Sequence, residues 1–287
     1  MKPTFWDRMQ TIDRRIIYAA LLVSILVPLS LKFSLPNYPA KQSIDFYNTV
    51  DKIGDDPASA NKIVIIDGWW SPSTRGENQW QAEAIVTHLM RRHIHFATLA
   101  FDIQNNTIMQ NAVVQPLAKK YGYVYGRDYV NWGFKPASVA SFTIKGLVTD
   151  IPGTLKTDAN GTPLTQIPVM KTIKTRADVA AVIDITPSKT PETWMGLFEQ
   201  NDNPPFLVAL TAVGAPTYYP YLDSKQMAGM LTGIKGAGDY EELLGTQSFG
   251  TQATAALSVV YALIILLIIL GNLGYYMARA ARRRAQR

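Results

Sequence analysis

The sequence predicts an α/β domain with a mainly parallel, Rossmann- or flavodoxin-like sheet of about five strands, flanked by two transmembrane helices. Two observations predict this class. Short runs rich in β-branched residues alternate with segments of helical periodicity, which is typical of βαβ units. The chain of 287 residues also has a long apolar segment near each end, whereas the region between them is polar and carries charges of both signs.

The first apolar segment, residues 16–35, is predicted to be an uncleaved membrane anchor that follows a cytoplasmic N-terminus, residues 1–15. Its core, IIYAALLVSILVPLSL, contains no charge, and Phe33 and Leu35 extend it past Lys32. Twenty helical residues span about 30 Å, the thickness of the hydrocarbon core. The alternative is a cleaved signal peptide, but the preceding residues are mixed in charge and no clear small-x-small cleavage site follows.

The second apolar segment, residues 253–277, is predicted to be a transmembrane helix followed by a basic cytoplasmic tail, residues 278–287. Its centre, VVYALIILLIILG, is uncharged, and Tyr275 and Tyr276 lie near its end. Five arginines follow in the tail. Aromatic residues followed by cationic residues are typical of a membrane exit.

The net charge of +6 belongs to the two ends of the chain. Residues 1–35 and 278–287 contain ten Lys and Arg against two Asp, whereas residues 36–252 contain 18 Lys and Arg against 20 Asp and Glu. By the positive-inside rule both termini are expected in the cytoplasm and residues 36–252 outside it. A nucleic-acid partner is not expected because the domain itself is not basic. The absence of cysteine excludes disulfides, thiol catalysis and cysteine-based metal sites.

Within the domain, the continuous β-branched run at residues 62–68 predicts a strand that is buried on both faces. Further strands are predicted at residues 93–101, 128–134, 179–185 and 206–213. Helices are predicted at residues 77–92, 105–121 with a kink at Pro116, 138–149, 190–200 and 223–244. Thr190 and Pro191 form a helix start signal. Residues 154–169 are expected to be irregular, with a type I′ turn at Asn160-Gly161.

Parallel α/β sheets bind ligands beyond the carboxyl ends of their strands, and this rule gives the candidate ligand-binding residues. They are Asp67, Trp69, Trp70, Asp102, Thr186, Thr211, Tyr218 and Tyr219. A carboxylate between aromatic side chains suits a polar or cationic small molecule. Alternatively, these aromatic residues contact a partner subunit or lipid. Asp102 and Asp184 are possible acid–base groups, but no second group at a fixed spacing assigns a reaction.

The sequence contains no known catalytic motif, so no catalytic residue, metal or cofactor is assigned. Neither a G-x-S-x-G nucleophile elbow nor a Walker motif is present. His88, His93 and His95 are expected to be surface residues at a helix–strand junction rather than metal ligands.

Three small residues lie four positions apart in the predicted final helix, namely Gly229, Gly233 and Ala237. In a continuous helix they form one stripe, which allows a second helix to approach closely. The stripe therefore predicts helix–helix contact within or between subunits.

Three segments resemble an uncharacterised prokaryotic membrane-protein family: TIDRRIIYAALLVSILVPL, YGRDYVNWGFKPA and TAVGAPTYYPYLDSKQMAGMLTGIKGAGDYEELLG. Members of that family have an N-terminal anchor, an extracytoplasmic α/β domain and a C-terminal transmembrane helix. The resemblance implies this topology in the cytoplasmic membrane of a prokaryote. It implies no reaction.

These observations favour a structural or assembly protein that forms a homo-oligomer or an accessory subunit of a membrane complex, with the lipid bilayer as a partner. Two anchors fix the orientation of the domain, which lowers the orientational cost of lateral association. One alternative is an extracytoplasmic small-molecule-binding or sensory module that uses the carboxyl edge of the sheet. A hydrolase or transferase built on the same edge is another.

Overall fold

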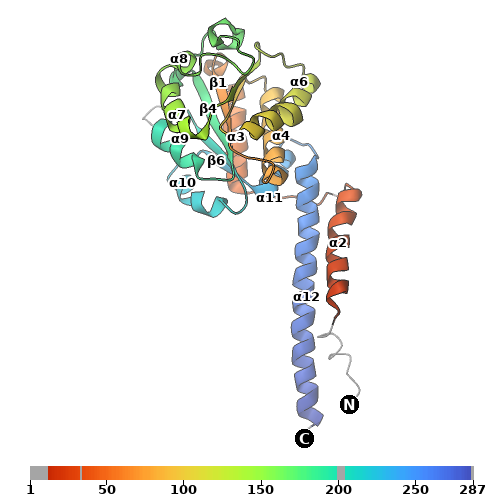
Figure 1. Ribbon diagram of the computed structural model, residues 1–287. Helices are drawn as coiled ribbons and strands as arrows, with labels where there is room; N and C mark the ends of the chain where they lie inside the picture. Colours follow the sequence, from red (N-terminus) through yellow and green to blue (C-terminus); the bar gives the residue numbers. More distant parts are fainter. Residues whose placement is uncertain (1–11, 33, 199–203, 286–287) are drawn as a thin grey trace. The chain divides into compact units, whose positions relative to one another are not determined.

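A six-stranded parallel sheet lies at the centre of residues Asn37–Gly250 in the computed structural model of the chain. The structure describes residues 12–32, 34–198 and 204–285. Met1–Pro36 and Thr251–Arg287 form a second unit, which contains α2 (Arg14–Ser30) and most of α12 (Phe249–Ala285) (Figure 1).

The strands follow the order β3-β2-β1-β4-β5-β6, and every neighbouring pair is parallel. They are β1 (Ile63–Gly68), β2 (Phe96–Ala100), β3 (Tyr129–Phe134), β4 (Val179–Thr186), β5 (Phe206–Leu210) and β6 (Gly229–Thr232). The direction of winding reverses between β1 and β4, which is the doubly wound Rossmann arrangement. The predicted Rossmann-like parallel sheet is confirmed, with one strand more than expected.

Helices cover both faces of this sheet. They are α3 (Lys41–Asp55), α4 (Arg75–Arg91), α5 (Ile103–Ile108), a π-helical segment (Met109–Val114), α6 (Gln115–Tyr121), α7 (Ala140–Thr149), α8 (Ile151–Leu155), α9 (Thr190–Phe198), α10 (Tyr219–Asp223) and α11 (Gly233–Leu243). Buried residues of α3, α4, α6 and α11 pack on one face, and those of α7, α8 and α9 pack on the other. Figure 1 shows α7 and α9 on the opposite side of the sheet from α4 and α6.

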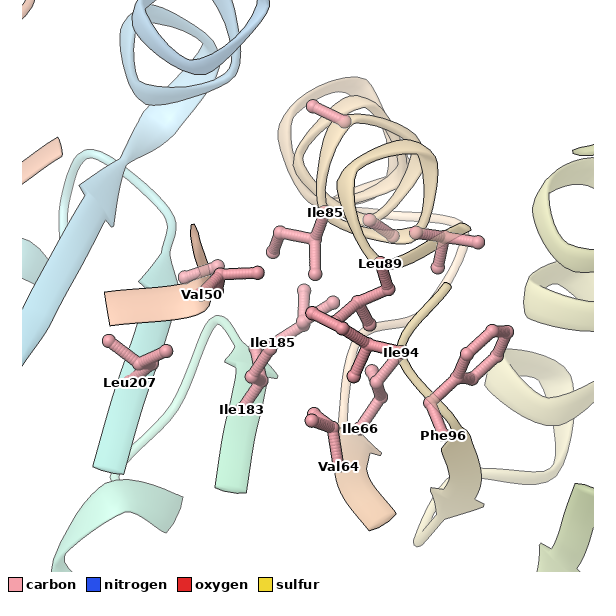
Figure 2. Close-up of a cluster of buried hydrophobic side chains, with 14 of the residues drawn as sticks. Val50, Val64, Ile66, Ile85, Leu89, Ile94, Phe96, Ile183, Ile185 and Leu207 are labelled. Carbon is pink, nitrogen blue, oxygen red and sulfur yellow. The ribbon is translucent and has the colours of Figure 1, made fainter. Parts of the chain in front are cut away.

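Alternation along the strands divides the hydrophobic core into these two layers. Val64 and Ile66 of β1 belong to the cluster under α4, whereas Ile65 belongs to the cluster under α7 and α9. Figure 2 shows Ile85 and Leu89 of α4 directed toward the strands of the first cluster. Both faces of β1 are therefore buried, as its continuous apolar sequence predicts.

The predicted helix at residues 223–244 is wrong in its first half, and the predicted stripe of small residues is wrong with it. Gly229 lies in β6, Gly233 begins α11 with a φ of +57°, and Ala237 lies one turn further along α11. A Cβ atom on Gly229 would lie 2.4 Å from Cα of Phe46 in α3. Gly229 is small because α3 crosses β6 at close range, and not because a second helix packs on a stripe.

Helix α3 lies where the sequence predicts no element, and a residue of α11 caps it. Ala40 precedes the helix and has no capping side chain of its own. The carboxylate of Asp239 accepts hydrogen bonds from the backbone N–H of Ala40 (3.0 Å), Ser43 Oγ (3.1 Å) and Asn37 Nδ2 (2.9 Å). Asp239 is fully buried, and Lys235 also donates to it.

A second carboxylate of α11 binds the segment that leads into α12. Glu241 accepts hydrogen bonds from the backbone N–H groups of Ser248 and Gly250, both at 3.0 Å. The ring of Phe249 stacks on Trp80 of α4 with centroids 4.4 Å apart. The chain is therefore bound to α11 both where it comes into the α/β unit and where it leaves.

We expect Asp239→Ala to lower the free energy of unfolding by about 2 kcal/mol, because it leaves the N–H of Ala40 and neighbouring polar groups without an acceptor. Asp45→Ala is the matched control, since Asp45 also pairs with a lysine four residues away, Lys41, but at an exposed position. Its expected cost is below about 1 kcal/mol. Denaturant unfolding of the full-length protein in detergent measures both, and equal effects would contradict the capping role.

Helix α12 is long and apolar enough to cross a membrane. Phe249–Ala280 covers 32 residues, and its most apolar window has a mean hydropathy of 2.8. The predicted span at residues 253–277 lies within this segment. It is the only described helix that meets these criteria of length and composition.

Helix α2 is shorter than the predicted anchor at residues 16–35. It has 17 residues and ends at Ser30, two residues after Pro28. Lys32 then takes a φ of +48°, which stops the helix. Its length is about 26 Å at 1.5 Å per residue. Residues 1–11 of the predicted N-terminus, Phe33 of the predicted anchor, residues 199 and 200 of the predicted fourth helix, and residues 286 and 287 of the tail lie outside the described residues.

Two local predictions need correction in detail. The helix predicted at residues 105–121 contains the π-helical segment Met109–Val114 immediately before Pro116, which lacks the N–H that a regular helix uses. Residues 154–169 are irregular as expected, but the turn is not type I′. Only Gly161 has a positive φ there (+83°), and the carboxylate of Asp158 binds the backbone N–H groups of Asn160 and Thr162.

Candidate functional site

The carboxyl ends of β1 and β4 meet at the point where the winding of the sheet reverses. The chain continues from β1 toward α4 on one face and from β4 toward α9 on the other. In doubly wound sheets, loops that diverge in this way leave a crevice that binds ligands.

Two aspartates lie side by side at this position. Asp67 of β1 and Asp184 of β4 are register partners on adjacent strands, and both are 0% exposed. Because neighbouring strands lie about 4.8 Å apart, the two carboxyl groups are close neighbours on the α9 face of the sheet. We call them the aspartate pair.

Each carboxyl group of the aspartate pair uses only one of its oxygens for hydrogen bonds. Asp67 Oδ2 accepts from the indole Nε1 of Trp69 (2.7 Å) and of Trp194 (2.5 Å). Asp184 Oδ2 accepts from Thr190 Oγ1 at 2.7 Å. Oδ1 of Asp67 and Oδ1 of Asp184 are buried and have no hydrogen-bond partner among the described residues.

Burial makes ionisation of the aspartate pair unfavourable. It raises the pKa of Asp67 to about 7, although the hydrogen bonds from Trp194 and Trp69 oppose the shift. The pKa of Asp184 is also raised, first by burial and then by the charge of Asp67. Near neutral pH the pair therefore holds at least one proton, and it can both donate and accept hydrogen bonds.

Trp69 and Trp70, which were both predicted to contact a ligand, lie on opposite faces of the sheet. Trp69 binds Asp67 and stacks on Phe101 with centroids 4.6 Å apart, so it covers the aspartate pair. Trp70 is fully buried in the hydrophobic core on the α4 face. Only Trp69 belongs to the environment of the pair.

The hydroxyl groups that follow β4 extend the polar environment of the pair. Thr190 Oγ1 lies 2.8 Å from Thr186 Oγ1, and Thr186 Oγ1 accepts from the backbone N–H of Ser188 at 3.0 Å. Thr190 was predicted only as a helix start signal. In the folded chain its hydroxyl binds Asp184 of the preceding strand.

The other predicted site residues are distributed around the same edge. Tyr218 is buried, and its pKa is raised by burial and by the charges of Glu192 and Asp184, so it lies near the pair. Tyr219 is exposed. Thr211 is buried just after β5, where its carbonyl accepts from the backbone of Gly214. Asp102 caps α5 by accepting from the N–H of Asn105 at 2.8 Å and has no described contact with the pair.

A second group of buried polar side chains lies on the α4 face of the sheet, near the point where the winding reverses. Gln81 donates to the backbone carbonyls of Leu210 and Gly233, both at 2.9 Å, and it binds Asn78. Oδ1 of Asn78 and Nδ2 of Asn105 have no hydrogen-bond partner among the described residues. Unpartnered polar atoms therefore occur on both sides of the point where the winding reverses.

His88 is not the surface residue that the sequence predicts. It is buried between α3, α4 and α11, with Nδ1 2.8 Å from the hydroxyl of Tyr240 and its ring stacked on Tyr47. Burial lowers the pKa of His88 to about 4. His93 is exposed and His95 is half-buried. Within the described residues, no group of three or more His, Asp and Glu side chains is placed to hold a metal ion.

Neither Asp67 nor Asp184 lines any of three surface cavities found in the described residues. The largest of the three, about 520 Å³, lies at the amino edge of the sheet near Lys52 and Arg176. A cavity of about 270 Å³ is lined by Glu83 and Ser248, and one of about 160 Å³ is lined by Trp194, which donates to Asp67.

The sequence predicts Asp67 as a site residue but does not predict the residues that bind it. Trp194 lies 127 residues away along the chain, and no local pattern connects the two. One signal does exist in the sequence, since β1 and β4 each carry the dipeptide Ile-Asp near their carboxyl ends, Ile66-Asp67 and Ile183-Asp184.

No protein-family model, curated protein or solved structure compared with the chain matches the chain.

Proposed function

We propose that the chain is a membrane-anchored α/β module that binds a small polar ligand at the carboxyl edge of its sheet. The observation that carries this proposal is the aspartate pair, whose carboxyl groups are buried at the reversal point and each keep one oxygen without a partner. Buried polar groups without partners are costly, and a ligand that binds them offsets this cost. A pair that shares protons suits amine or hydroxyl donors rather than anions.

The membrane anchorage that we propose has two spans, with α2 and α12 both crossing the cytoplasmic membrane of a prokaryote. The basic residues beyond each apolar segment favour two cytoplasmic termini and an extracytoplasmic α/β domain. Helix α2, about 26 Å long, is slightly shorter than the hydrocarbon core, and flanking residues or local thinning of the bilayer compensate for this difference. Labelling of single cysteines in the two termini and the domain with a membrane-impermeant reagent tests this topology.

Self-association, or a place in a larger membrane complex, is the second candidate function. The stripe of small residues no longer supports it, because Gly229 lies in a strand. Its remaining support is the double anchorage that we propose, because two anchors in one bilayer lower the orientational cost of lateral association. Native mass spectrometry from mild detergent tests it, and a monomer at membrane-like concentration would exclude a homo-oligomer.

A thermal-shift screen of the full-length protein tests ligand binding, with amino acids, polyamines, sugars and nucleotides as probes. We expect at least one probe with amine or hydroxyl donors to raise the melting temperature. At 100 times its Kd, such a ligand stabilises the folded state by about 2.7 kcal/mol. Asp67→Asn and Asp184→Asn should abolish the shift, whereas Asp158→Asn, a change of a buried carboxylate outside the crevice, should preserve it. The proposal fails if no probe shifts the wild type, or if both pair variants retain the full shift.

A further inference from the structure

We propose that the carboxyl edge of the sheet docks on the surface of the lipid bilayer through a rim of exposed apolar side chains. We call this set the apolar rim. It consists of Tyr38, Ile103, Val139, Phe142, Val213 and Tyr219. The proposal rests on the membrane anchorage proposed above and does not rest on ligand binding by the aspartate pair.

Apart from Tyr38, which precedes α3, the members of the apolar rim lie beyond the ends of strands. Ile103 begins α5, which follows β2, and Val213 lies three residues after β5. Val139 and Phe142 lie in the 3₁₀ turn and first turn of α7 that follow β3. Tyr219 begins α10, in the connection that follows β5. Because the sheet is entirely parallel, all these strand ends lie at one edge.

The most exposed apolar side chains of the described α/β unit lie at this edge, whereas the less exposed Val124 (46%) and Tyr125 (37%) precede β3. The four most exposed large apolar residues of the described α/β unit are Val213 (91%), Tyr38 (87%), Phe142 (79%) and Ile103 (63%), and all belong to the rim. The surfaces of soluble proteins bear scattered single apolar residues, but several exposed apolar side chains at one edge indicate an interaction surface.

The chain also leaves the α/β unit toward the same edge. After α11, the carbonyl of Leu244 accepts from Arg91 at 2.7 Å, near the C-terminal end of α4. Ser248 Oγ then donates to Glu83 at 3.3 Å, and Phe249 stacks on Trp80. The segment therefore runs back along α4 toward its N-terminus, which directly follows the loop after β1.

The incoming connection lies at this edge as well. Lys235 Nζ, in the first turn of α11 just beyond β6, donates to the carbonyl of Tyr38 at 3.2 Å. From Lys41, α3 runs to Asp55, and a short connection then leads to the start of β1 at the amino edge. Both connections to the apolar helices therefore leave the unit at the edge that carries the rim.

These positions favour the bilayer as the partner over a soluble protein. Both connections lead directly to apolar segments, so the nearest large apolar phase lies beyond the edge that carries the rim. Tyrosine and other aromatic side chains are suited to the membrane–water interface. Charged residues of both signs follow the same strand ends along the chain, Arg75, Lys135 and Lys189 against Glu77, Asp102 and Glu192. Docking is therefore apolar and not directed to anionic lipids.

Site-directed spin labelling of the full-length chain tests this proposal, because the protein has no native cysteine. Single labels at Phe142→Cys and Val213→Cys report on the rim, and Asn61→Cys, an exposed position just before β1, is the matched control at the amino edge. In phosphatidylcholine nanodiscs, collisions with oxygen, which is enriched in lipid, are compared with collisions with a water-soluble nickel chelate.

We expect both rim labels to favour oxygen over the nickel chelate by several-fold relative to the Asn61 label. That ratio corresponds to insertion within about 5–10 Å of the headgroup boundary. It should not change when the salt concentration is raised or anionic lipid is added. Rim labels as accessible to the nickel chelate as the Asn61 label would overturn the proposal. Shielding from both reagents together with dipolar broadening between labels would also overturn it, because a second copy of the chain would then cover the rim.

Discussion

Replacement of Gly229 by alanine is expected to lower the free energy of unfolding by about 3 kcal/mol or more. The new Cβ atom would lie 2.4 Å from both Cα and N of Phe46, so the backbone of α3 must move away from β6. This movement also disturbs the ring of Phe46, which is fully buried and packs edge-on against Tyr240 with centroids 5.3 Å apart. Denaturant unfolding of the full-length protein measures the loss.

Gly196→Ala is the matched control for this substitution. Gly196 lies in α9, and a Cβ atom built on it meets nothing within 4 Å. Alanine is favoured over glycine in a helix, so this variant should be neutral or more stable by up to about 1 kcal/mol. If Gly229→Ala unfolds at the same denaturant concentration as Gly196→Ala, the close contact between α3 and β6 is not a determinant of stability.

The second large effect is a loss of stability between about pH 4 and pH 7 that depends on Asp67. In the unfolded chain this carboxyl group ionises near pH 4, whereas burial raises the pKa of Asp67 to about 7 in the folded protein. Between these values the folded state binds more protons, so its stability falls as the pH rises. A difference of about three pKa units corresponds to a loss of about 4 kcal/mol in the free energy of unfolding, and this loss is complete above pH 7.

Asp67→Asn should remove the contribution of Asp67 to this pH dependence, because the amide oxygen still accepts from Trp69 and Trp194 but no longer ionises. The contribution of Asp184, whose pKa burial also raises, should remain. We expect the variant to be more stable than the wild type at pH 8 and to match it more closely at pH 4. Asp56→Asn is the control. The hydrogen bond from Ser59 lowers the pKa of Asp56, so the contribution of Asp56 to stability is lost only on acidification. Asp56→Asn should therefore leave the pH dependence of stability between pH 5 and 8 unchanged. Parallel wild-type and Asp67→Asn stability curves would contradict the assignment.

The strands that are buried on both faces could be predicted from the sequence because their signal is local. Ile63–Gly68 and Val179–Thr186 each begin with a continuous apolar run, residues 63–66 and 179–183, and each strand pairs with strands on both sides in the structure. Their sequence pattern alone therefore identifies the centre of the sheet.

Strand β6 could not be predicted, because its formation depends on distant contacts. The segment Gly229–Thr232 has only four residues and begins with glycine, which has little intrinsic preference for a strand. It becomes a strand by pairing with β5 and by fitting closely under Phe46 of α3. The four-residue spacing of Gly229 and Gly233 fits a helix as well, but tertiary packing makes Gly229–Thr232 a strand.

The candidate site was predictable only in part for the same reason. The position of Asp67 at the end of a buried strand follows from the sequence, and the register of β1 with β4 brings Asp184 beside it. Neither Trp194, which donates to Asp67, nor Thr190, which donates to Asp184, has a local signal of that role. The burial of His88 likewise depends on α3 and α11, which come from distant parts of the chain.

The capping of α3 by Asp239 has a consequence for the order in which the chain folds. Ser43 and Asp239 are 196 residues apart, and α3 packs against β6 and α11, the last elements of the α/β unit. During synthesis α3 therefore cannot pack against β6 and α11 until residues beyond Thr232 have left the ribosome. Until then Phe46 and Val50 lack the residues that they contact in the folded unit. The β1–β2 pairing can form earlier, so closure of the unit by α3 is a late step and coincides with the synthesis of α12.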